Sequence, residues 1–156
     1  MSHRNAGFQR VAKFLARVPF NMLVGLQLTR LHRDGITLEC PIRRELRNSA
    51  GAAHGGVAAT MADAAVGIAL QRHFGGKRPI TTVELKVNYF RPITQGRLIA
   101  RSHLLRIGSR LSVGSVDLTD ERSRPVGTAI VTYMVVSPPH ATGYPRAARR
   151  PSPRTR

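Results

Sequence analysis

The chain is 156 residues long, 42% of them hydrophobic, and carries a formal net charge of +17 from 25 basic and 8 acidic residues. This length fits one domain with a real core, and the single cysteine, Cys40, excludes a disulfide framework and a cysteine-rich zinc site. No run approaches the about 20 apolar residues of a membrane span, and no signal-peptide pattern opens the chain, so we expect a soluble cytoplasmic protein.

The excess of basic residues has two possible explanations. It indicates a polyanionic partner, such as nucleic acid, a membrane surface or a phosphorylated small molecule, or it merely reflects a GC-rich genome. Segment 137–156 holds five prolines, five arginines and no acid, which is typical of a disordered, solvated tail that acts as a spacer or binds polyanions weakly. Twenty basic and eight acidic residues remain outside the tail, so the rest still carries +12.

The first segment, 1–20, shows the apolar periodicity of an amphipathic helix, which should end before Pro19. The apolar face of this expected helix consists of Phe8, Val11, Phe14 and Leu15. We treat 1–20 as an N-terminal helical segment that precedes the main domain at 21–136.

The main domain opens with two expected strands, 25–31 and 36–41, separated by the turn-forming pair Asp34-Gly35. Four more strands are expected at short intervals, over 80–90, 96–106, 110–120 and 125–136. In the first of these four, alternating apolar side chains should share one face: Val83, Leu85, Val87 and Tyr89. Strands joined by short turns are typical of an antiparallel meander.

A long apolar segment, 57–70, separates the two groups of strands. Almost every residue in it is apolar or small, so we expect a helix that is buried on all sides. The helix should run to about Phe74 and end at Gly75-Gly76. The simplest packing wraps the curved antiparallel sheet around this helix, which is an α+β fold.

One acid, Asp63, lies among alanines within this helix. An unpaired carboxylate in an apolar environment costs several kcal/mol, so the group must be paired, protonated or used. Burial can prepare such a carboxylate for work as a general base. The alternative is an acid that simply reaches a capping group or a subunit surface.

The triplet His54-Gly55-Gly56 stands at the start of the same helix. The first amides of a helix have no internal partner and carry the positive end of the dipole, so a carbonyl oxygen could approach them as in an oxyanion hole. The alternative is a tight strand-to-helix turn. Asp63 lies eight residues beyond Gly55, about 12 Å along a helix, so both could act on one carbonyl only across a dimer.

Several short motifs together resemble the hotdog-fold acyl-CoA thioesterases of the phenylacetate-pathway (PaaI) type. Their order and spacing match from about Gly25 to Val136. The motifs are Asn48, His54-Gly55-Gly56-Val57, Thr60-Met61-Ala62-Asp63, Thr82-Val83-Glu84-Leu85-Lys86-Val87-Asn88-Tyr89-Phe90-Arg91-Pro92, Gly96, Gly108-Ser109-Arg110 and Asp117.

The resemblance implies a hotdog fold, with an antiparallel sheet around a central buried helix, to which this chain adds an N-terminal helix. It implies hydrolysis of an acyl- or aryl-CoA thioester to the free acid and CoA. Asp63 matches the family's catalytic carboxylate, acting as nucleophile or as general base. Gly55 matches the residue whose backbone N–H polarises the thioester carbonyl.

The same resemblance assigns supporting roles. His54 would orient the turn, and Gly56 would help to bind substrate. Asn48 matches a polar residue that holds substrate or water near the thioester. Thr82 matches a residue that positions the attacking water, although the alignment could slip to Thr81.

Family members assemble from hotdog dimers, often into tetramers, so the resemblance implies at least a homodimer and favours a homotetramer with shared active sites. The CoA phosphates need basic groups at the pocket mouth. The candidates are Arg91, Arg106 and Arg110, each of which could equally be an ordinary surface arginine. No metal or redox cofactor is implied.

Other functions stay open at this point. A non-catalytic acyl-CoA-binding hotdog protein would keep Gly55 without needing Asp63. Specific nucleic-acid binding is disfavoured, because there is no helix-turn-helix pattern and only 5% of residues are aromatic. A hotdog dehydratase would need an Asp/His pair on a different helix motif. The acyl group is left open, and the nearest residues that could select it are Val57, Met61 and Ile68.

Overall fold

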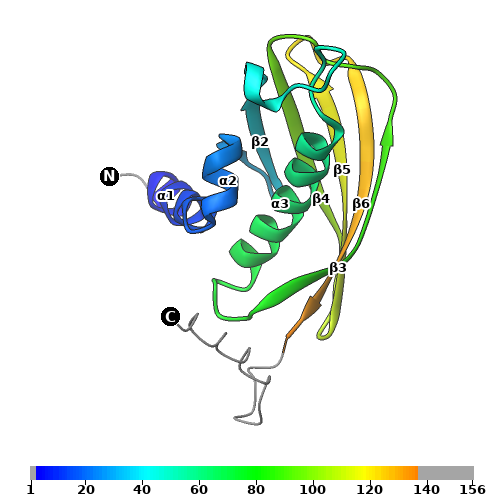
Figure 1. The fold of residues 1–156 in the computed structure, drawn as a ribbon. Coiled ribbons are helices and arrows are strands. Elements are labelled where there is room, and N and C mark those ends of the chain that lie inside the picture. Colours follow the sequence, from blue (N-terminus) through cyan, green and yellow to red (C-terminus); the bar gives the residue numbers. More distant parts are fainter. Residues whose placement is uncertain (1–2, 137–156) are drawn as a thin grey trace, which may run out of the picture.

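A six-stranded antiparallel sheet curves around one long helix, α3 (Gly55–His73), as the ribbon in Figure 1 shows. The computed structural model describes residues 3–136, and the expected tail at 137–156 lies outside them. The strand order is β1-β2-β4-β5-β6-β3. The bounds are β1 (Gln27–Leu31), β2 (Ile36–Pro41), β3 (Ile80–Tyr89), β4 (Arg97–Ile107), β5 (Leu111–Asp120) and β6 (Pro125–Val135).

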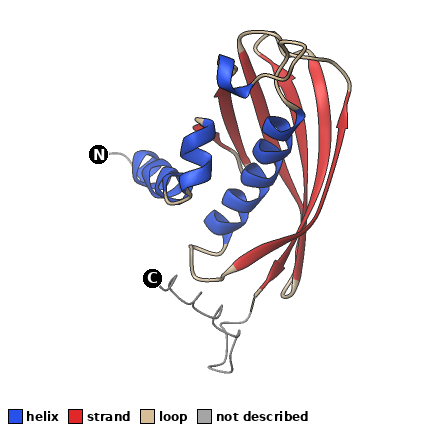
Figure 2. Ribbon diagram, viewed as in Figure 1, coloured by secondary structure: helices blue, strands red, loops and turns tan. Residues whose placement is uncertain are grey.

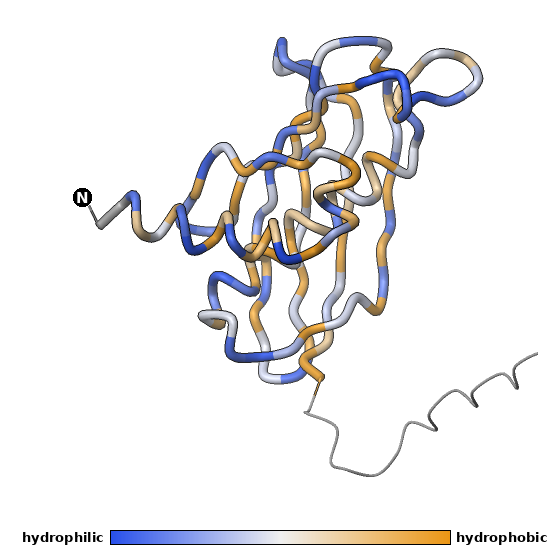
Figure 3. The backbone as a smooth tube through the Cα atoms, turned by 60° about the vertical axis from the view of Figure 1, so that its left-hand side comes forward, coloured by the Kyte–Doolittle hydropathy of each residue, from blue (hydrophilic) through white to orange (hydrophobic). Residues whose placement is uncertain are grey.

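The helices lie on one face of the sheet (Figure 2). The central strands alternate between buried residues that face α3 and less buried residues on the other face, as in β4, where Leu98, Ala100 and Ser102 are buried. Figure 3 shows hydrophobic residues along the strands and hydrophilic ones in the turns. The expected α+β arrangement, a sheet around a central helix, is confirmed.

Helix α3 is buried over most of its surface, as expected from its composition. The expectation of burial on all sides is wrong for one strip, because Ala59, Thr60 and Asp63 are only half-buried. These positions share one face of the helix, which neither the sheet nor the N-terminal helices cover fully. Beyond α3 the chain turns at Gly75 and Gly76, whose φ angles of +64° and +74° favour glycine.

The N-terminal segment forms two helices, α1 (His3–Ala16) and α2 (Pro19–Val24). The end of the first helix before Pro19 was predicted, but the second helix was not, because Pro19 starts α2 at a position that needs no amide donor. Val11 and Leu15 of α1 are 1% and 5% exposed and join the core beside α3. Helix α2 ends at Gly25, whose φ is +87°.

Strand β3 forms one edge of the sheet and, within residues 3–136, pairs with β6 alone. A β-bulge interrupts this pairing between Thr82 and Glu84, so Thr82 lies opposite Tyr133 and Leu85 lies opposite Val131. Since Tyr133 and Val131 are buried, Thr82 shares the helix-facing side with Leu85. The predicted alternation therefore holds from Leu85 onward and fails at Val83, where the bulge changes the phase.

The remaining segments are short. The polar stretch after β2 contains a 3₁₀ helix, η1 (Arg44–Leu46). Among the helices of the described residues, none is long and apolar enough to cross a membrane.

Candidate active site

Asp63 lies in the middle of α3, on the side that faces β3 and β6. Its Oδ1 atom accepts a hydrogen bond of 2.7 Å from the Thr82 hydroxyl and one of 2.8 Å from the Tyr133 hydroxyl. Within residues 3–136, its Oδ2 atom has no hydrogen-bond partner. The two donors therefore fix the carboxylate in one orientation and leave one oxygen available to substrate or water.

Thr82, and not its neighbour Thr81, makes the contact with Asp63, because the bulge in β3 turns Thr82 toward the helix. The sequence left open which threonine matches the family's residue, and the register of β3 against β6 brings Thr82 to the side of Asp63. A β-bulge beside a polar cluster of this kind is a common way to re-aim a side chain.

Tyr133, on β6, belongs to this cluster and was missed at the sequence level. Its hydroxyl also reaches the main-chain oxygen of Asp63, at 2.9 Å. Burial, followed by the nearby Asp63 carboxylate, raises the pKa of Tyr133 above its usual value, so the side chain stays a neutral donor. The one available signal was Gly67: a Cβ there would lie 2.5 Å from the Tyr133 hydroxyl, so the glycine makes room for it.

The start of α3 carries the proposed oxyanion donor. Within residues 3–136, the N–H of Gly55 has no hydrogen-bond acceptor. The N–H of Gly56 is occupied, because the Nδ1 atom of His54 accepts it at 2.9 Å. Of these two amides, the one of Gly55 is left open in the described residues, and His54 caps the helix.

Gly56 is needed for this cap, since a Cβ at that position would lie 2.9 Å from the His54 ring nitrogen. On the other side, the Tyr89 hydroxyl donates a hydrogen bond of 2.9 Å to the Gly55 carbonyl oxygen. The backbone around the free Gly55 amide is thus held from both sides, as a preorganised donor requires.

Asn48 lies in the loop before α3 and shapes that loop. Its Oδ1 atom accepts hydrogen bonds from the amides of Ala50 and Ala52, at 3.0 and 3.1 Å. Asn48 lines a cavity of about 490 Å³ together with Gly55 and Arg91. The structure therefore brings Asn48, His54, Gly55, Gly56 and Arg91 to one cavity.

Asp63 and Thr82 do not line that cavity in the same chain. Leu98, near the start of β4, lines this cavity, whereas Arg106 lies near the end of the same strand. Arg110 lies in the turn before β5, and neither arginine lines the cavity. Within one chain, the predicted residues therefore fall into two groups, one at the start of α3 and one around Asp63.

Two cavities beside α3 concern the residues that could select the acyl group. One, of about 570 Å³, lies between α2, η1 and the start of α3, and Val57 lines it. The other, of about 190 Å³, lies beside Asp63 and is lined by Ile68. Met61 is 0% exposed and lines none of these cavities, so it is a core residue.

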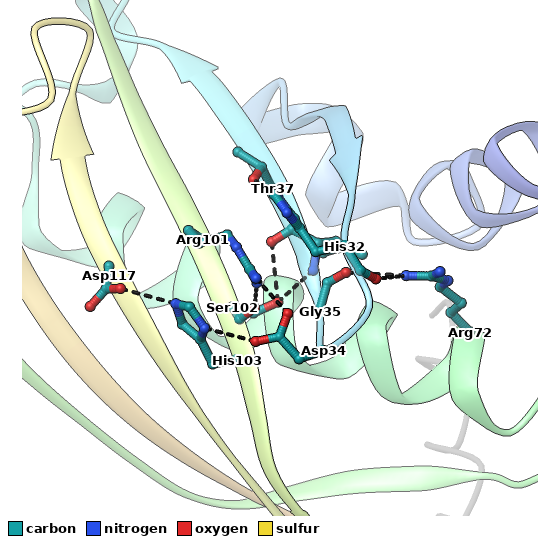
Figure 4. Close-up of polar contacts among 10 residues, drawn as sticks. His32, Asp34, Gly35, Thr37, Arg72, Arg101, Ser102, His103 and Asp117 are labelled. Atoms are coloured by element: carbon teal, nitrogen blue, oxygen red, sulfur yellow. Dashed lines mark hydrogen bonds and ion pairs between the residues drawn. The ribbon is translucent and has the colours of Figure 1, made fainter. Parts of the chain in front are cut away.

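A separate polar cluster lies where the β1–β2 turn meets β4 (Figure 4). Asp34, in the β1–β2 turn, contacts Arg101 and the Nδ1 atom of His103, and the Nε2 atom of His103 lies 3.0 Å from Asp117. The hydrogen bonds from Arg101 and His103 lower the pKa of Asp34 to about 2. These contacts link the β1–β2 turn to β4 and, through His103, to β5.

No group of three or more His, Cys, Asp or Glu side chains within residues 3–136 is arranged to hold a metal ion. The candidate site instead offers an oriented carboxylate, that of Asp63, and a free backbone amide, that of Gly55. These are the parts needed to add a nucleophile to a carbonyl and to stabilise the resulting oxyanion.

Comparison with known proteins agrees with this chemistry. Residues 50–126 match the Thioesterase superfamily. The medium/long-chain acyl-CoA thioesterase YigI of Escherichia coli is 30% identical over 137 residues, covering 78% of this chain and 88% of that protein. Acyl-coenzyme A thioesterase 13 of Mus musculus is 27% identical over 124 residues, with 78% and 88% covered.

Solved structures give the same fold. A putative esterase of Mycobacterium tuberculosis aligns with a TM-score of 0.73 at 26% identity, covering 78% of this chain and 98% of that one. A mutant form of the phenylacetic acid degradation protein PaaI of Thermus thermophilus aligns with a TM-score of 0.69 at 24% identity, covering 76% and 100%.

The fold and the comparisons together define a hotdog-fold hydrolase. The chain belongs to the thioesterase superfamily and is a thioester hydrolase.

Proposed function

We propose that the chain hydrolyses acyl-CoA thioesters at a site built from Asp63 of one subunit and Gly55 of another. The observation that carries the proposal is the arrangement around Asp63. Thr82 and Tyr133 both donate to Oδ1, and Oδ2 is left without a partner in the described part of the chain. The activities named for the related thioesterases support CoA esters as the substrate class.

A second subunit is needed because of distance. Asp63 and Gly55 of one chain are separated by two turns of α3, about 12 Å, which is too far for both to contact one carbonyl. The half-buried strip that contains Asp63 lies on the side of α3 toward β3 and is the part of the helix that a partner could approach.

Strand β3 supports a dimer on that side. It is an edge strand of ten residues with exposed apolar side chains, including Val83 and Tyr89, which are 50% and 55% exposed. The unpaired backbone groups of such an edge can form hydrogen bonds with a strand of another chain. Pairing of two β3 strands would cover it and bring Asp63 of one subunit toward Gly55 of the other. Further assembly into a homotetramer, and a cytoplasmic location, are part of the same proposal.

In this site the thioester carbonyl oxygen accepts the Gly55 N–H, which stabilises the negative charge that develops on it. Asp63 of the other subunit either attacks the carbonyl carbon, forming an anhydride that water opens, or takes a proton from an attacking water. In both routes the C–S bond breaks and CoA leaves as the thiol. The acyl group becomes a carboxylic acid.

The CoA part and the acyl part of the substrate then bind in two separate cavities. The CoA arm lies in the cavity that contains Gly55, where Arg91 at its edge can meet a phosphate. The acyl arm lies in the cavity beside Asp63. Arg106 and Arg110 are candidates for further phosphate contacts in the assembled protein.

The test is a thiol-release assay over aryl-, short- and long-chain acyl-CoA esters, with Asp63→Asn as the matched control. Asparagine keeps an oxygen that can accept from Thr82 and Tyr133, so the fold should survive while hydrolysis falls by about a thousandfold or more. Full activity in Asp63→Asn would contradict the proposed mechanism. Saturable binding without thiol release by the wild-type protein would instead indicate a non-catalytic acyl-CoA binder.

A further inference from the structure

The cavity beside Asp63 runs along one face of α3, from Asp63 to Gln71, two turns further on. Apolar side chains also line it, among them Val18 and Ile68. Its volume is about 190 Å³, close to the roughly 150 Å³ of a cavity that holds a benzene ring. A compact acyl group, such as an aryl ring or a short chain, fits this space.

Asn21, on α2, forms part of the wall of this cavity and is only 6% exposed. Its side chain has no hydrogen-bond partner among residues 3–136. No side-chain nitrogen or oxygen in the described residues is both fully buried and unpaired, so the Asn21 amide keeps a small accessible area. Because the rest of the residue is buried, we infer that the accessible area of the amide faces this cavity.

The Asn21 side chain takes no part in the hydrogen bonds that end α2. The backbone of Asn21 is already satisfied, because its N–H donates to the Val18 carbonyl and its own carbonyl accepts from Gly25 and Leu26. A buried amide without a partner is less favourable than an apolar side chain of the same shape. Among the described residues this amide has no partner, so its position in the Asp63 cavity leaves it open to a polar group of a ligand there.

Gln71 is a second amide on the same cavity. It is half-buried and, within the described residues, its side chain also makes no hydrogen bond. The cavity thus combines a carboxylate, apolar side chains and two amides that have no partner among the described residues. A small number of polar groups in a mostly apolar pocket is the usual basis of ligand specificity.

We propose that Asn21, assisted by Gln71, recognises a hydroxyl or oxo group on the acyl part of the substrate. The preferred substrates are then compact acyl-CoA esters with a polar substituent a few atoms from the thioester. This inference rests on the proposed function, because it takes the Asp63 cavity as the acyl site. Asn21 lies outside residues 50–126, so the match to the superfamily does not supply this assignment.

The experiment uses pairs of CoA esters that differ by one hydroxyl group, such as butyryl with 3-hydroxybutyryl and benzoyl with its hydroxylated forms. The wild-type protein should prefer the hydroxylated member of at least one pair by about tenfold or more in kcat/KM. Asn21→Leu, which keeps size and removes the amide, should bring the kcat/KM ratio between the two members of that pair close to one. Gln71→Leu should reduce the preference and is the second variant if Asn21→Leu folds poorly.

Two outcomes overturn the inference: no hydroxyl preference in the wild-type protein, or an equal loss on both members of a pair in Asn21→Leu. The second outcome would give the amide a purely structural role. Titration of the same pairs into Asp63→Asn measures the ratio of Kd values without turnover. Failure of the proposed function would appear separately, as no thiol release from any ester or as full activity in Asp63→Asn.

Discussion

The phenolic oxygen of Tyr133 lies 2.8 Å from Oδ1 of Asp63, although the two residues are 70 positions apart in the chain. Gly67, one helical turn after Asp63, leaves the space that the hydroxyl occupies. Because burial and the Asp63 carboxylate raise the pKa of Tyr133, the hydroxyl remains a donor to that carboxylate at neutral and mildly alkaline pH. Tyr133 is therefore a positioning residue for Asp63.

Tyr133→Phe should keep the ring in the core and remove one of the two donors to Asp63. A hydrogen bond to a charged group contributes about 1.5–3 kcal/mol, so we expect kcat to fall by roughly ten- to a hundredfold with little change in KM. Steady-state kinetics with one acyl-CoA ester measure this split. Thr82→Val should behave similarly, and Thr82→Ser, which keeps a hydroxyl donor, should recover most of the rate. Wild-type kcat in Tyr133→Phe would contradict the positioning role.

Gly55→Pro should abolish hydrolysis and leave the fold intact. Proline lacks the N–H that is proposed to bind the carbonyl oxygen, and it is well tolerated at the first position of a helix. The preceding residue, His54, has φ −62° and ψ 136°, which is the conformation that proline favours before it.

Gly55→Ala is the matched control for that change. It keeps the amide and places a Cβ about 3.3 Å from the Tyr89 ring, so activity should be reduced only moderately. Thiol release and the thermal midpoint Tm are measured for both variants. An active, folded Gly55→Pro protein would exclude this amide as the oxyanion donor.

Arg91 borders the Gly55 cavity, so Arg91→Ala should raise KM for CoA esters by about five- to tenfold at low salt. The effect should vanish with a pantetheine thioester, which lacks the nucleotide phosphates of CoA. Equal losses on both substrates would assign Arg91 to the fold of the pocket. The same pair of substrates tests Arg106→Ala and Arg110→Ala, which contact CoA only if the assembled protein brings them to the pocket.

Acid should weaken the contacts of the β1–β2 turn. The pKa of Asp34 is lowered from 3.8 to about 2 by the hydrogen bond from Arg101 and then by that from His103. A lowered carboxyl pKa gives stability that is fully present above the unfolded value and is lost as the pH falls through the folded value. The Asp34 contribution should therefore decline between about pH 4 and pH 2.

Urea unfolding of the wild-type protein and Asp34→Asn at pH 5 and at pH 2 measures that contribution. The two proteins should differ at pH 5, and the difference should shrink at pH 2. A difference that is independent of pH would show that the Asp34 charge does not stabilise the turn.

Much of the fold could be predicted from local patterns. The expected strand 36–41 coincides with β2, and the apolar segment 57–70 lies within α3. Periodicity identified these elements because burial on one face or on all faces repeats with the geometry of the element. Helix α2 was missed because Pro19 suggests the end of one helix and gives little sign that another begins.

The site was predicted less completely, because its parts come from distant segments. The Asp63 contact with Thr82 depends on a bulge in β3, and a one-residue change of register is invisible in the residue pattern. Tyr133 reads as an ordinary strand residue until the sheet places it against α3. The free amide of Gly55 was anticipated, but the cap that His54 makes on Gly56 depends on a side-chain orientation that spacing alone does not supply.

The shared site can be tested most directly by combining two inactive variants, Asp63→Asn and Gly55→Pro, in one preparation by co-expression or by refolding together. If each site takes Asp63 from one subunit and Gly55 from the other, a mixed dimer has one intact site and one site with both changes. Random pairing should then restore about a quarter of wild-type activity. If both residues act within one chain, every site in the mixture is damaged, and the absence of any restored activity would contradict the account.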